Sequence, residues 1–73
     1  MNITKLYKET KYELRSLFNN DLPKYMEYLD KQIDEFRFFN KRFEKVGVEI
    51  FPTAYIEIKK RIAKEIFETA EQQ

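Results

Sequence analysis

The chain has no cysteine, histidine or tryptophan, and Gly47 and Ser16 are its only glycine and serine. Without cysteine no disulfide can stabilise it, and without cysteine or histidine the usual zinc and haem ligands are missing. The same absence removes the nucleophile–base pairs from which most covalent catalysis is built. No glycine-rich phosphate loop is present either. We therefore expect a protein that is not an enzyme and holds no cofactor or metal.

The shortage of turn-forming residues predicts an all-α protein. One glycine and two prolines are too few for a sheet protein, whereas 37% charged residues is typical of surface helices. A chain of 73 residues forms one domain with a marginal core, for which self-association is a common remedy. No apolar run suggests a membrane span or signal peptide, so we expect a cytoplasmic protein without a membrane partner.

Residues 21–46 carry the clearest pattern in the chain. Apolar side chains recur every seven residues with a second set four positions later, which predicts one long amphipathic helix; the positions are Leu22, Leu29, Phe36 and Phe43, then Met26, Ile33 and Asn40. Asp21 is expected to cap its start and Gly47 its end. A buried Asn40 would either fix the register of an assembly or bond to backbone or water.

Two shorter helices are expected on either side of this long one. Residues 3–18 place an apolar arc on one face, made of Ile3, Leu6, Tyr7, Thr10, Leu14, Leu17 and Phe18. Asn2 or Thr4 is expected to cap the start of this helix, and Asn19 and Asn20 to end it. Residues 53–70 form the third helix, although alternation around Pro52 leaves a small hairpin over 48–58 as an alternative.

These elements predict a single helical domain over residues 1–73. Short connections make successive helices antiparallel neighbours, which gives a small three-helix up-down-up bundle built on the long central helix, with dimerisation expected. The net charge is only +1. Residues 21–35 nevertheless sum to −3, from two basic and five acidic side chains, and residues 36–46 to +3, from four basic and one acidic. The bundle should therefore have an acidic end and a basic end.

The predicted interaction site lies on the basic half of the long helix. Phe38 falls on the side opposite the apolar seam, and Phe39 and Tyr28 flank that seam, so three helices do not cover all of these rings. Aromatic residues and arginine are enriched at protein interfaces. The expected partner-binding residues are Arg37, Phe38, Phe39, Lys41, Arg42 and Tyr28.

Three kinds of function fit these observations. The favoured one is a small helical dimer or adaptor that binds a larger protein and regulates or inhibits it, with a composition typical of phages and mobile elements. The first alternative is a regulatory protein that binds nucleic acid through its basic end, using Lys5, Lys8, Arg37, Lys41, Arg42, Lys45, Lys59, Lys60 and Arg61. The second is a structural component of a larger assembly.

Overall fold

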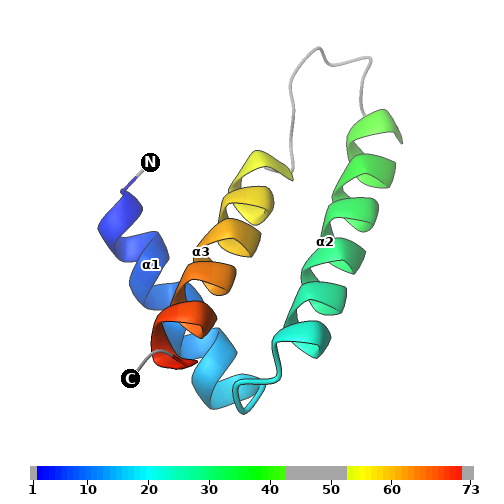
Figure 1. Ribbon diagram of the computed structural model, residues 1–73. Helices are drawn as coiled ribbons and strands as arrows, with labels where there is room; N and C mark the ends of the chain where they lie inside the picture. The colour runs from blue at the N-terminus through cyan, green and yellow to red at the C-terminus, as the bar shows by residue number, and fades with distance from the viewer. Residues whose placement is uncertain (1, 43–52, 72–73) are drawn as a thin grey trace.

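The structure is a computed structural model that describes residues 2–42 and 53–71 (Figure 1). Within these residues the chain forms α1 (Ile3–Tyr12), a π-helical turn η1 (Glu13–Leu17), α2 (Leu22–Arg42) and α3 (Thr53–Glu71). The predicted all-α three-helix bundle is confirmed. Residues 53–58 are helical, so the hairpin alternative is wrong for its second strand. The predicted Gly47 cap lies outside the described residues.

Helix starts and the first turn follow the local sequence. The Asn2 side chain accepts a hydrogen bond from the Lys5 amide at 3.2 Å, and Asp21 accepts one from the Lys24 amide at the same distance. Asn19 and Asn20 have φ values of 52° and 60°, a left-handed geometry that asparagine tolerates better than most residues. The caps and the turn are therefore where the sequence predicted them.

The turn η1 rotates the end of the first helix relative to a regular α-helix. The Phe18 amide donates to the Glu13 carbonyl oxygen five residues earlier, at 3.1 Å, which widens the turn. This brings Phe18 against the core and leaves Leu17 59% exposed. The predicted apolar arc is thus wrong for Leu17, because it assumed an uninterrupted 3.6-residue period. It is also wrong for Ile3 and Tyr7, which are 57% and 41% exposed on α1.

Helix α3 lies between α1 and α2 and packs along both (Figure 1). Within the described residues, α1 and α2 share no comparable contact along their lengths. The helix that the other two pack against is therefore α3, although α2 is the longest. The reason is that apolar side chains cover a wide arc of α3, so that it can pack against α1 and α2 at the same time. The buried members of this arc are Ile56, Ile62, Ala63 and Ile66.

The core residues of α2 differ slightly from the predicted seam. Leu29 and Ile33 are buried as expected, and Leu22, Met26 and Phe36 pack against the core from its edge. Tyr25, which the predicted seam omitted, is fully buried. Asn40 is only partly buried, so it is not the buried polar residue that its position in the heptad pattern suggested.

Candidate functional site

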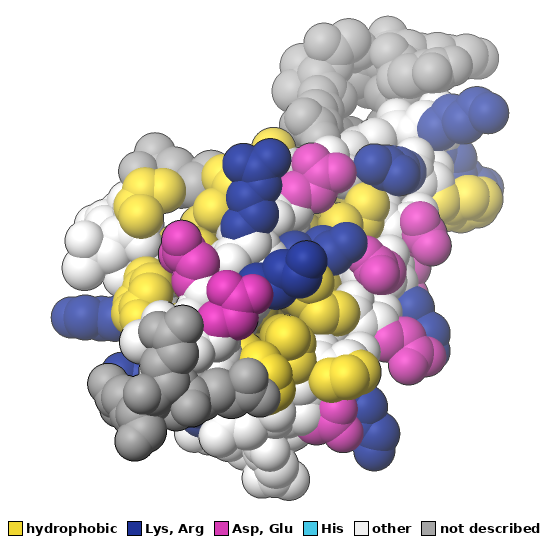
Figure 2. Space-filling view, viewed as in Figure 1, with side chains coloured by type: hydrophobic (Ala, Val, Ile, Leu, Met, Phe, Trp, Pro, Cys, Tyr) yellow, Lys and Arg dark blue, Asp and Glu magenta, His cyan; other side chains and the backbone are white. Residues whose placement is uncertain are grey.

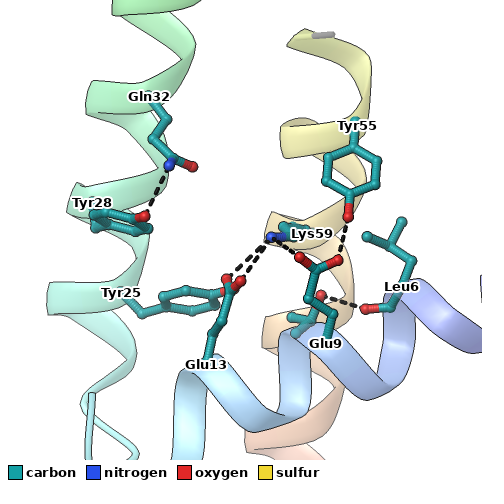
Figure 3. A network of polar contacts seen from close by, with 9 residues as sticks. Leu6, Glu9, Glu13, Tyr25, Tyr28, Gln32, Tyr55 and Lys59 are labelled. Carbon is teal, nitrogen blue, oxygen red and sulfur yellow. Dashed lines mark hydrogen bonds and ion pairs between the residues drawn. The ribbon is translucent and has the colours of Figure 1, made fainter. Parts of the chain in front are cut away.

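A buried lysine joins α3 to α1 and η1. Lys59 on α3 is only 5% exposed, and its ammonium lies 3.0 and 3.1 Å from the two carboxylate oxygens of Glu13. A carboxylate oxygen of Glu9 is 3.4 Å from the same ammonium. Glu9 and Glu13 are one helical turn apart, so both reach this cation from α1 and η1. One cation thus binds two anions at the junction of α1 and α3 (Figure 3).

Two tyrosines, one on α2 and one on α3, complete this cluster. The Tyr25 hydroxyl of α2 donates to Glu13 at 2.6 Å, and the Tyr55 hydroxyl of α3 donates to Glu9. The Tyr55 ring also lies 5.2 Å from the Lys59 ammonium, within the range of a cation–π contact. We call Glu9, Glu13, Tyr25, Tyr55 and Lys59 the buried polar cluster. It connects all three helices through charge-assisted hydrogen bonds.

Hydrogen bonding and burial shift the pKa values of three side chains in the cluster. The hydrogen bond from Tyr55 lowers the pKa of Glu9 below 4.5, aided by the positive charge of Lys59. Accepting that bond, Glu9 raises the pKa of Tyr55 to about 12. Burial, and then the bond to Glu13, raises the pKa of Tyr25 above its ordinary value. At neutral pH the Glu9 carboxylate is therefore charged and both tyrosines are neutral.

The polar groups of the cluster satisfy one another. Lys59 is enclosed by its two carboxylates, and no buried side-chain polar atom among the described residues lacks a hydrogen-bond partner. A satisfied polar network of this kind fixes how helices pack, with Lys59 buried and the Glu9 side chain 42% exposed at its edge. Over residues 2–42 and 53–71 there is also no group of three acidic side chains placed to hold a metal ion.

The nucleic-acid alternative predicts Lys59 on a basic surface, but Lys59 is buried in the interior. Lys60 contacts Asp30 at 2.6 Å, and Arg37 contacts Glu57 at 3.4 Å, so these two cations face carboxylates across the α2–α3 packing. The remaining proposed cations are exposed residues of α1, α3 and the end of α2; they are Lys5, Lys8, Arg61, Lys41 and Arg42. Lys45 lies outside the described residues.

The predicted interaction residues near the end of α2 do lie together on the surface. Phe38 is 59% exposed and Phe39 is 40% exposed, with their rings edge to face and 5.5 Å apart between centroids. Lys41 and Arg42 are exposed in the next turn. An apolar group with lysine and arginine side chains above it is visible at the upper right of Figure 2, over this end of α2. We call Arg37, Phe38, Phe39, Lys41 and Arg42 the α2 patch.

Tyr28 lies on the same helix but about 15 Å from the α2 patch, as ten residues of helix require. Its ring contacts Phe18 at 5.1 Å between centroids, and its hydroxyl accepts a hydrogen bond from Gln32 at 2.8 Å. The ring is still 39% exposed. Tyr28 therefore belongs partly to the aromatic packing at the first turn and partly to the outer surface of α2.

The buried polar cluster is what sequence reasoning missed. Its only signal was spacing: Glu9 and Glu13 stand four apart, and so do Tyr55 and Lys59. Such i, i+4 pairs are also ordinary on solvated helix faces, so the spacing alone does not reveal a buried contact.

Comparison with known protein families, curated proteins and solved structures finds no significant match. None of the described helices combines the length and apolar character needed to span a bilayer. The surface of the chain itself is therefore the guide to its function.

Proposed function

We propose that the protein is a non-enzymatic interaction module that binds another protein chain through the α2 patch, and thereby regulates that chain. The observation that carries this is the exposure of Phe38, which is 59% exposed beside Phe39 on a helix whose other exposed side chains are mostly charged. Contiguous exposed aromatics rimmed by cations are typical of interface hot spots.

The electrostatics of the patch support an acidic binding surface on the other chain. Arg37 already faces Glu57, but Lys41 and Arg42 make no ion pair within the described residues. These two cations favour approach of negative charge, while the phenylalanines supply apolar area. The nucleic-acid alternative has less support, because Lys59 is buried and the near-neutral chain has its other cations divided among three helices.

Affinity capture with point variants tests the proposal. Phe38→Glu removes the ring and adds a negative charge to the patch, so we expect loss of every protein captured specifically by the wild-type chain. Tyr12→Glu is the matched control, because Tyr12 is 60% exposed on α1, away from the patch. Both variants should keep the helical circular dichroism of the wild type.

Two results would contradict the proposal. One is capture that is unchanged by Phe38→Glu while the variant remains folded. The other is equal loss with both variants, which would place the binding surface elsewhere. Using an untagged copy of the chain as one of the candidate preys also detects self-association in the same experiment.

A further inference from the structure

A second copy of the chain is the partner that the outer face of α2 fits best. This inference rests on the proposed function, because it assumes that α2 is an interaction helix, and it names the occupant. On the exposed side of α2, Tyr28, Lys31, Glu35 and Phe38 are spaced by three, four and three residues. They lie within an arc of about 100° on a 3.6-residue helix, as the a and d positions of a coiled-coil seam do.

All four of these side chains belong to exposed residues. The arc lies away from Leu29 and Ile33, which face α3, and α1 does not run along it. Phe39 stands next to Phe38 at the edge of the same arc. The face is therefore open for a second helix over about 15 Å of α2.

The order of residues on this face is self-complementary about the level of Ile33. Tyr28 and Phe38 are each five residues from that level, and Lys31 and Glu35 are each two residues from it. When two copies pack antiparallel about a two-fold axis there, Tyr28 of one copy meets Phe38 of the other. Lys31 then meets Glu35, and every contact occurs twice, as an isologous interface requires.

We propose that the protein forms a homodimer in which the two α2 helices pack antiparallel in this register. The pairing places aromatic rings on aromatic rings and opposite charges on opposite charges, each favourable in a helix–helix interface. Within one copy Lys31 contacts Glu27 at 3.7 Å on an exposed surface, and so weak a pair does not hold it away from the second copy.

The same register limits the length of the interface. The next layer outward brings Lys24 of one copy to Arg42 of the other, a pair of like charges at each end. We therefore expect the interface to be confined to the four central layers. This unfavourable pair also makes the register testable, because Lys24→Glu converts both end layers into attractive pairs. The Kd for self-association of this variant should be roughly two- to thirty-fold lower than that of the wild type.

A charge exchange provides the decisive experiment. Lys31→Glu alone places the new carboxylate opposite Glu35 of the other copy, and Glu35→Lys alone places the new ammonium opposite Lys31. Each variant should therefore self-associate more weakly than the wild type. Mixing the two variants restores opposite charges in both central layers. Sedimentation of the separate and mixed variants should show a heterodimer at concentrations where each variant alone is monomeric.

The outcomes separate this inference from the proposed function. Mixed variants that associate no better than the separate ones overturn the antiparallel register. So does a wild-type chain that stays monomeric up to millimolar concentration. If that monomeric chain still loses a captured protein on Phe38→Glu but not on Tyr12→Glu, the proposed function stands and the occupant of α2 is a different protein. If neither variant changes any binding, both proposals fail.

Discussion

Lys59 is a positive charge held inside a small helical protein by two carboxylates of α1 and η1 and the ring of Tyr55. Removing a charge from water is costly, and the attraction between buried partners often does no more than offset that cost. What the pairing does provide is selectivity, since a different docking of α1 would leave the lysine without its partners. The cluster therefore specifies one arrangement of the helices more than it adds stability.

Replacing Lys59 with methionine should destabilise the fold strongly, because Glu9 and Glu13 would then face each other without a cation. We expect a loss of about 3 kcal/mol in the free energy of unfolding, at the lower end of the range for broken buried pairs because Glu9 is partly exposed. Urea denaturation measures it. Lys64→Met, on the exposed side of α3, is the control and should change stability by less than about 0.5 kcal/mol.

The triple variant Glu9→Gln, Glu13→Gln, Lys59→Met should recover part of that loss, since it removes the repulsion and keeps an acceptor for each tyrosine. An equal effect of Lys59→Met and Lys64→Met would mean that the buried polar cluster contributes nothing to folding.

The pKa shifts in the cluster predict a pH dependence of stability at both extremes. The folded pKa of Glu9 is depressed, so its contribution is present above about 4.5, its ordinary value, and is lost as pH falls through the folded value. The folded pKa of Tyr55 is raised to about 12, so its contribution is present below about 10 and is lost as pH rises towards 12.

The free energy of unfolding should therefore depend less on pH in two variants, each in its own pH range. Glu9→Gln should reduce the dependence on the acid side, and Tyr55→Phe on the alkaline side. If each variant keeps the wild-type slope in its own range, the hydrogen bond between Glu9 and Tyr55 does not contribute in solution.

At the scale of elements, the three α-helices differ in what holds them. Helices α2 and α3 bury aliphatic side chains against each other, whereas α1 and η1 contribute Leu6, Leu14 and the buried Thr10, whose hydroxyl bonds to the Leu6 carbonyl oxygen at 2.8 Å. The attachment of α1 therefore relies more on the buried polar cluster than that of the other two helices does.

Leu29→Ala should be the more damaging of two leucine truncations. Leu29 is fully buried in α2, so we expect a loss of about 2–5 kcal/mol in the free energy of unfolding, enough to unfold a marginal domain. Leu17→Ala changes the same side chain on the exposed side of η1 and should cost less than about 0.5 kcal/mol. Similar losses in thermal or urea unfolding would show that the core is not where α2 meets α3.

At the scale of the whole molecule, the shortage of turn-forming residues and the hydrophobic periodicity together predict an all-α bundle, and capping residues predict where the first two helices start. Local side-chain caps and asparagines at positive φ made the turn at Asn19 predictable too. Periodicity failed at η1, because one wide turn shifts every later side chain and nothing in the local composition marks it. It also failed for Tyr25, since a tyrosine becomes a core residue only when its hydroxyl finds a partner such as Glu13.

Which side chains are exposed could be predicted only where the position on one helix decides it. Exposure of Phe38 follows from its angle on α2 alone, and the structure agrees. The number of exposed cations at the basic end is overestimated from the sequence, because a count of charges treats every lysine as exposed to solvent. Whether Lys59 faces water or two glutamates depends on a contact between residues far apart in the chain, which no local pattern encodes.

The long sequence separation within the buried polar cluster has a consequence for the order of folding. Glu13 and Lys59 are 46 residues apart, whereas α2 and α3 follow each other directly in the chain. Closing the longer loop costs more chain entropy, so the α2–α3 pair is expected to assemble first and α1 to dock last. During synthesis, α1 leaves the ribosome before its lysine partner exists. Of these three helices, the one synthesised first is thus expected to be the last to dock.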